Sequence, residues 1–110
     1  MIEFEDFLKV DIRVGTVIDA QIFEKARKPA YKVWVDFGPD FGVKKTSGQI
    51  TQNYTPETLI GRQVCGVINF PPKQIADYMS EFLILGMNDN DGNITLIAPD
   101  KNIPNGQRLY

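Results

Sequence analysis

The chain has 110 residues, a formal net charge of −2 and an isoelectric point near 5.0. Dedicated nucleic-acid binders are usually basic, so this balance counts against strong RNA binding while leaving room for a local basic patch. With no histidine and one cysteine, Cys65, the chain cannot form a histidine-based triad, a histidine metal site or an internal disulfide.

The hydrophobic fraction of 43% and charged fraction of 24% are those of an ordinary soluble protein. The length fits one domain, residues 1–110, with one core. No apolar run approaches the roughly 20 residues that cross a bilayer. The N-terminus MIEFEDFLKV lacks the features of a secretory signal. We therefore expect a cytoplasmic protein without membrane insertion.

The N-terminal segment Ile2–Leu8 places apolar residues three and four apart, which is the spacing of one helical face. It is either a helical arm on the body or a tail that plugs the end of a barrel, and its apolar face needs a partner such as another subunit. Val10–Ala20 then alternates as a strand. Gly15 breaks the phase of this strand, which predicts a bulge of the kind that small barrels use to close.

The next segments give a polar connection and the clearest strand. Gln21–Ala30 is rich in charge and is either a solvated loop or a basic lip on a binding groove. In Tyr31–Gly38 the apolar residues Tyr31, Val33, Val35 and Phe37 alternate with polar ones and are expected in the core. The alternation leaves Trp34 on the polar side, either as an exposed stacking platform or covered by a partner subunit or the N-terminal arm.

The middle of the chain predicts a returning strand, a short helix and a buried strand. Phe41–Thr51 is polar and has a second glycine break, at Gly48. Tyr54–Leu59 has the features of a helix start, with Thr55 as N-cap and Pro56 at the first position, and Gly61 is expected to end it. Val64–Ile68 is almost continuously apolar, as in a strand that is buried on both faces.

The segment Asn69–Gly86 combines a Pro-Pro break, a polar-aromatic turn and a second apolar strand. Because such an interruption costs backbone hydrogen bonds, we expect this loop to have a function. Phe82–Met87 and Asn93–Ala98 are predicted to pair across Asn88–Gly92. This turn is not a calcium loop, since Met87 and Ala98 stand where the first and last ligands belong.

About five strands, one short helix after the third and glycine breaks in strands one and three predict an all-β protein. The expected architecture is a five-stranded OB-fold barrel with short helices and N- and C-terminal extensions. In that fold the outer surface of strands two and three, with its flanking loops, is the usual ligand face. Polar candidates expected there are Lys32, Asp36, Lys45, Ser47 and Gln49, with Trp34 beside them.

The sequence offers no catalytic constellation. The carboxylates are scattered, Ser47 and Ser80 have no histidine to activate them, and GVKKTSGQ lacks the glycine-lysine pattern of a phosphate loop. We therefore expect a binding module, not an enzyme, with no metal and no cofactor.

Two ligand classes remain open. For RNA, the chain offers phosphate contacts and the stacking residues Tyr31 and Trp34; the basic residues are Lys25, Arg27, Lys28, Lys44, Lys45 and Lys73. For a peptide or unfolded chain, it offers an apolar groove with adaptable methionine; the residues are Phe41, Phe70, Pro71, Pro72, Tyr78, Met79 and Phe82. The acidic net charge favours a ligand that is basic and apolar, as export signals are.

Five motifs carry a resemblance to a known family: FLKVDIRVGTVIDA, KVWVDFG, SGQIT-x-x-Y, IGRQV and NFPPKQI-x-x-x-x-SEFLILG. From about Phe7 to Gly106 the chain resembles the CsaA family of export-related chaperones. That family is part of a wider group of OB-fold tRNA-binding domains, which includes the C-terminal domain of methionyl-tRNA synthetases.

The resemblance implies an OB barrel, a homodimer whose interface uses the terminal segments, and no cofactor. It also implies a chaperone that holds preproteins and cooperates with SecA. The tRNA-binding relatives carry a basic run and Ser-x-Gly-Met in the loop after Pro72. Here Lys73 and Ser80 match, but Ala76, Asp77 and Phe82-Leu83 depart from the pattern, which counts against tRNA binding.

The sequence thus predicts a chaperone for presecretory or unfolded polypeptides, with a structure-specific tRNA binder as the alternative. The candidate peptide-binding residues are Trp34, Phe41, Phe70, Tyr78, Met79 and Phe82. The candidate polar-rim or tRNA-binding residues are Lys32, Asp36, Lys45, Ser47, Gln49, Asn69, Lys73 and Ser80.

Overall fold

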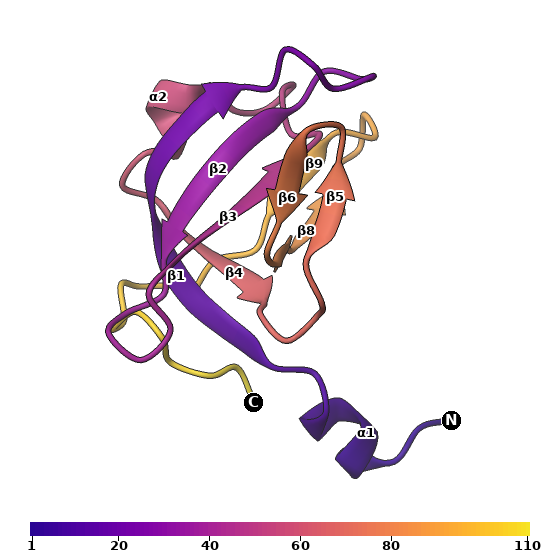
Figure 1. Ribbon diagram of the computed structural model, residues 1–110. Helices are drawn as coiled ribbons and strands as arrows, with labels where there is room; N and C mark the ends of the chain where they lie inside the picture. Colours follow the sequence, from indigo (N-terminus) through magenta and orange to yellow (C-terminus); the bar gives the residue numbers. More distant parts are fainter.

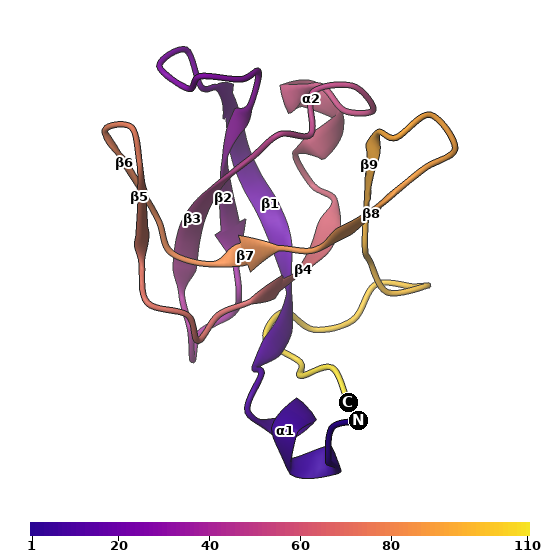
Figure 2. The ribbon, with the colours of Figure 1, turned by 90° about the vertical axis from the view of Figure 1, so that its right-hand side faces the viewer.

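The computed structural model describes residues 1–110. A five-stranded antiparallel sheet in the order β3-β2-β1-β4-β7 curls into a nearly closed barrel (Figures 1 and 2). This confirms the predicted OB fold. The barrel strands are β1 (Ile12–Ile22), β2 (Tyr31–Asp36), β3 (Val43–Gly48), β4 (Gln63–Val67) and β7 (Leu83–Ile84).

Two short hairpins and two short helices complete the chain. The remaining elements are β5 (Lys73–Ile75) with β6 (Tyr78–Ser80), β8 (Gly86–Asn88) with β9 (Ile94–Leu96), α1 (Phe4–Leu8) and α2 (Pro56–Leu59). Neither helix has the length or apolar character to cross a membrane.

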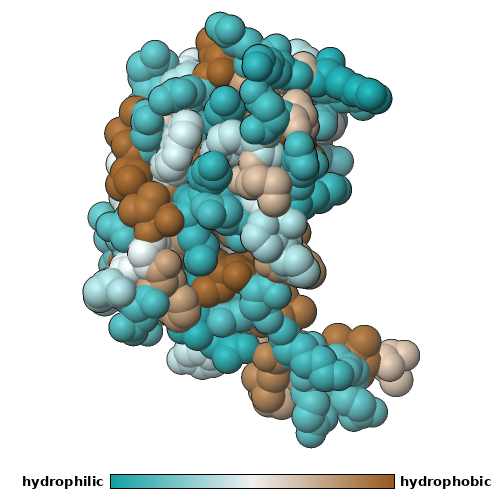
Figure 3. All heavy atoms as spheres, viewed as in Figure 1, coloured by the Kyte–Doolittle hydropathy of each residue, from teal (hydrophilic) through white to brown (hydrophobic).

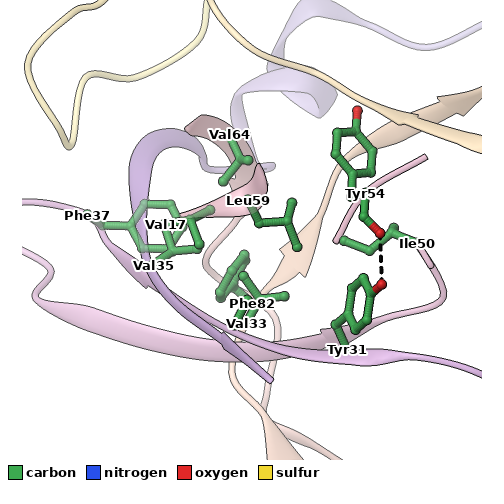
Figure 4. Close-up of a cluster of buried hydrophobic side chains, with 11 residues drawn as sticks. Val17, Tyr31, Val33, Val35, Phe37, Ile50, Tyr54, Leu59, Val64 and Phe82 are labelled. Carbon is green, nitrogen blue, oxygen red and sulfur yellow. Dashed lines mark hydrogen bonds between the residues drawn. The ribbon is translucent and has the colours of Figure 1, made fainter. Parts of the chain in front are cut away.

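The barrel core is built from the inward side of β2 and its neighbours (Figure 4). Tyr31, Val33, Val35 and Phe37 are all buried, as their alternation predicts. The hydroxyl of Tyr31 donates a 2.8 Å hydrogen bond to the carbonyl oxygen of Tyr54, so the one polar atom that this strand sends inward is satisfied.

The predicted glycine bulges are wrong in position. The register between β1 and β2 shifts between Val17 and Asp19, beyond Gly15, and β3 pairs with β2 without a shift up to Gly48. Gly15 instead permits close packing, because a Cβ there would lie 2.5 Å from Cγ1 of Val35. The alternation detects the break in phase, but a glycine does not identify which residue bulges.

The helix and the turn at Asn88–Gly92 form as predicted. The predicted strand Phe82–Met87 is divided, because Leu83–Ile84 pairs with β4 and only Gly86–Asn88 pairs with β9. The side chain of Thr55 accepts from the Thr58 backbone N–H, and Thr58 Oγ1 accepts from the Thr55 N–H. Threonine here completes the reciprocal cap that glutamate usually completes. In the β8–β9 turn, Asp89 accepts from the amide of Asn53 and the backbone N–H of Asn93 and Asp91, which lowers the pKa of its carboxyl group.

The N-terminal segment projects from the barrel as a helical arm, and it does not plug the barrel end (Figures 1 and 2). No residue of α1 is buried. Figure 3 shows hydrophobic side chains gathered on this arm, where Ile2, Phe4 and Leu8 are exposed. The amide of Asn69 fixes the root of the arm, because it donates to the Lys9 carbonyl and accepts from the Asp11 N–H.

Candidate functional site

The segment after Pro72 is a β-hairpin, β5–β6, where the sequence predicts only a turn. It stands beside β3, outside the barrel (Figures 1 and 2). Ala76 at its tip has φ = 54°, a left-handed conformation that side chains other than glycine rarely adopt. Each strand has three residues, too few for a period of two to be recognised in the sequence.

Tyr78 anchors the hairpin on the outer surface of the barrel. Its ring centroid lies 5.4 Å from that of Phe23 and 6.2 Å from that of Trp34. The ammonium groups of Lys32 and Lys45 lie 5.0 and 4.9 Å from the same ring. Trp34 is half-buried and packs edge-on against Tyr78 of its own chain.

The hydroxyl group of Tyr78 is buried and has no hydrogen-bond partner. Burial, and to a smaller extent the charge of Glu81, raise the pKa of Tyr78 to about 12. The ring therefore holds the hairpin through packing and cation–π contacts, not through its polar atom.

Ser80, the last residue of β6, and Glu81, which follows it, protect the outer edge of β3. Glu81 donates its backbone N–H to the Lys45 carbonyl and accepts from the Lys45 N–H with its carboxylate. The Ser80 hydroxyl accepts a 3.3 Å hydrogen bond from the Ser47 N–H. An outermost strand with free backbone groups would otherwise be open to pairing with another chain.

The hairpin tip is also joined to the loop between β1 and β2. Lys25 Nζ lies 2.9 Å from Asp77 Oδ2, and this contact raises the pKa of Lys25 and lowers that of Asp77. Both side chains are exposed, so the ion pair contributes little to stability. It does connect two segments that border a cavity.

An apolar pocket of about 440 Å³ lies where the hairpin arms meet the seam between β3 and β7. Phe70 and Leu83 are about half exposed there, while Phe82 reaches it from the core. The full lining is Thr46, Ser47, Phe70, Pro71, Lys73, Ile75, Ser80, Phe82 and Leu83. Polar groups are few, and the Ser47 and Ser80 hydroxyls lie 3.2 Å apart.

A second pocket of about 710 Å³ lies between the hairpin and the loop after β1. Its cations are Lys25, Arg27 and Lys28. Ser47 and Ile75 line both pockets, so the two adjoin at these residues. We call the two adjoining pockets the hairpin groove, with an apolar half at Phe70 and Leu83 and a basic half at Arg27 and Lys28.

The structure brings most of the predicted site residues to this region. Those that line the groove are Ser47, Gln49, Phe70, Lys73, Ser80 and Phe82, and those in the cluster that supports the hairpin are Lys32, Trp34, Lys45 and Tyr78. Met79 is exposed on the hairpin but lines neither half.

Three predicted residues lie outside the groove and have structural partners. Asp36 accepts from the Gly38 N–H, Asn69 fixes the arm, and Phe41 packs beneath the guanidinium of Arg13, 4.6 Å from the ring centroid. Sequence reasoning missed Ile75 and Leu83 as lining residues. The one signal in the sequence was that both residues lie within Asn69–Gly86, the segment that is expected to have a function.

The groove is lined by apolar, hydroxyl-bearing and cationic side chains, which suit the binding of a ligand. No cluster of three acidic or cysteine side chains could hold a metal ion. A family model described as "Putative tRNA binding domain" matches residues 12–108. The chain belongs to this family of OB-fold tRNA-binding domains.

Solved structures and curated sequences refine the relationship within the tRNA-binding domain family. Chaperone CsaA from Bacillus anthracis is 46% identical, with a TM-score of 0.93 over 100% of this chain and 99% of that one. CsaA from Picrophilus torridus is 45% identical, also with a TM-score of 0.93, over 100% of both chains. This member of the family is therefore CsaA-like.

Curated relatives of the chain include methionine–tRNA ligases. Methionine–tRNA ligase of Bacteroides fragilis is 37% identical over 110 residues, which is 98% of this chain and 16% of the ligase. The tRNA-binding domain thus spans about one-sixth of the length of this curated relative.

Proposed function

We propose that this CsaA-like domain is a chaperone that binds unfolded or presecretory polypeptides and supports SecA-dependent export from the cytoplasm. The observation that carries the proposal is the apolar half of the hairpin groove. Phe70 and Leu83 expose apolar surface around a pocket that has room for a large side chain. Such surface on a soluble protein marks a place where another apolar group binds.

In this proposal the groove residues have different roles. An apolar side chain of the bound polypeptide contacts Phe70 and Leu83, with Ile75 as the wall. The hydroxyls of Ser47 and Ser80 hydrogen-bond its backbone. Trp34 and Tyr78 act indirectly, because they position the hairpin. Binding of this kind needs no cofactor and no bond-breaking step.

The second candidate is tRNA binding, and a specific observation favours it. Lys32, Lys45, Lys73, Arg27 and Lys28 lie on the hairpin side of the barrel, and none of them has a carboxylate within ion-pairing distance. An acidic protein therefore presents a basic surface at its groove, as phosphate contacts require. The family model also points to this ligand.

A competition titration separates the two functions. A fluorescent apolar peptide and bulk tRNA are each titrated at low and at physiological salt, using wild type, Phe70→Ser and Lys73→Ala. For a chaperone, peptide binding persists in salt and is lost in Phe70→Ser. For a tRNA binder, affinity falls steeply with salt, and Lys73→Ala lowers the slope by about one. tRNA binding without any peptide binding would refute the chaperone.

A further inference from the structure

The charged side chains that line the hairpin groove are all cations, although the chain as a whole is acidic. The chain carries a net charge of −2, yet no aspartate or glutamate lines either half of the groove. Arg27 and Lys28 at one end and Lys73 at the other are cations without an ion-pair partner, whereas Lys25 is neutralised by Asp77. A ligand in the groove meets this local field, not the net charge.

The floor of the groove includes backbone groups that can pair with a peptide. β3 is the outermost strand of the sheet. The Ser47 carbonyl receives only a 3.5 Å contact from Thr46 Oγ1, and the N–H and C=O of Gln49 have no hydrogen-bond partner. The edge protection by Glu81 and Ser80 therefore ends at Ser47. An extended peptide can add to such an edge through main-chain hydrogen bonds.

The groove is also shaped for one apolar group beside anionic ones. The apolar half has aliphatic walls, Ile75, Pro71 and Leu83, which suit an aliphatic or aromatic side chain. The basic half begins at the same Ser47 and Ile75 and ends at Arg27 and Lys28. In an extended chain successive side chains point to opposite faces, so residues two apart along a bound peptide reach successive parts of one groove.

We propose that the hairpin groove binds an extended acidic peptide segment. An apolar side chain fills the pocket at Phe70 and Leu83, the backbone pairs with β3 at Ser47–Gln49, and neighbouring carboxylates lie at Arg27 and Lys28. This rests on the proposed chaperone function and reverses its charge preference, since the net charge alone predicts basic segments. RNA would satisfy the cations but not the free strand edge.

The test compares three peptides that share an apolar centre and differ only in flanking residues: acidic, neutral or basic. Fluorescence anisotropy is expected to show the acidic peptide binding about tenfold tighter than the basic one at low salt, with the gap narrowing as salt screens the charges. Arg27→Glu combined with Lys28→Glu is expected to reverse this order. Lys101→Glu, an exposed charge change outside the groove, is the control and keeps it.

Backbone pairing has its own readout. Methylation of every second backbone nitrogen of the acidic peptide is expected to abolish binding when the methylated nitrogens face β3. It is expected to leave binding unchanged when the other set is methylated, because only every second N–H faces β3.

If the three peptides bind equally, or the basic one binds best, the acidic preference is refuted and the chaperone function stands. If no peptide binds while tRNA does, the chaperone function itself is refuted.

Discussion

Tyr78 combines two properties at the scale of a single residue. Its ring contacts Phe23 and Trp34 and holds the hairpin, while its hydroxyl is buried without a partner. A buried hydroxyl that has given up water without gaining a hydrogen bond costs stability. The contacts of the ring therefore stabilise the hairpin in spite of the polar atom.

Tyr78→Phe is expected to stabilise the protein by about 1 kcal/mol, because it removes the unpaired hydroxyl and keeps the ring. The matched control is Tyr31→Phe, which removes a hydroxyl that donates to the Tyr54 carbonyl. It is expected to destabilise by about 1 kcal/mol. Urea denaturation measures both. A loss of stability in Tyr78→Phe equal to that in Tyr31→Phe would show that the Tyr78 hydroxyl is bonded.

The same residue predicts a pH dependence. The pKa of Tyr78 is about 12 in the folded state and about 10 for an ordinary tyrosine. As the pH rises, Tyr78 therefore loses its proton in the unfolded chain before it does so in the folded protein. The stability that depends on a protonated Tyr78 is fully present below pH 10 and is lost as the pH rises towards 12. Wild type should lose more stability than Tyr78→Phe over this window. Parallel curves for the two proteins would contradict the raised pKa.

At the scale of the elements, the hairpin β5–β6 is the part of the fold that the sequence did not predict. Strands with several alternating residues were predictable, as in Tyr31–Gly38, because the period of two reports burial directly. The three-residue strands of the hairpin carry no such period, and its packing depends on Tyr78 contacting Trp34 across 44 positions of chain, a distant contact that no local pattern encodes.

The candidate site follows the same division. The sequence marked Asn69–Gly86 as the segment with a function, and this segment supplies Phe70, Lys73 and Ser80 to the groove. The sequence alone could not show which of its residues line the groove and which only support the hairpin. Phe41 has the same side chain as Phe70 but lies beneath Arg13, a contact across 28 positions of chain that no local pattern encodes.

Strain at the hairpin tip gives an element-scale prediction. Ala76 has φ = 54°, where a Cβ atom costs about 1–2 kcal/mol that glycine does not incur. Ala76→Gly is therefore expected to stabilise the protein by about 0.5–1 kcal/mol after the added entropy of the unfolded glycine is subtracted. Ala98→Gly is the control, because Ala98 lacks a positive φ, and it should be neutral or destabilising in the same urea titration. Equal effects would refute strain at the tip.

At the scale of the whole molecule, two exposed apolar surfaces bear on the proposals. One is the hairpin groove, and the other is the N-terminal arm, where Ile2, Phe4 and Leu8 are exposed and no helix residue is buried. The arm is fixed at its root by Asn69, and Arg108 donates a hydrogen bond to the Leu8 carbonyl at the end of the helix. A helix of five residues is not stable alone in water, so its apolar face needs a partner.

We propose that the partner is the arm region of a second copy, as the resemblance to CsaA implies, and the arm provides the test. Phe4→Ser with Leu8→Ser removes the two largest exposed apolar side chains of α1, so the dimer is expected to dissociate to monomers in sedimentation velocity at micromolar concentration.

The control is Ile22→Ser, a change at a similarly exposed residue at the opposite end of β1, which should leave the dimer intact. Because the arm does not line the hairpin groove, monomers should still bind one peptide per chain. A monomeric wild type, or a dimer that survives both arm substitutions, would refute the arm as the interface.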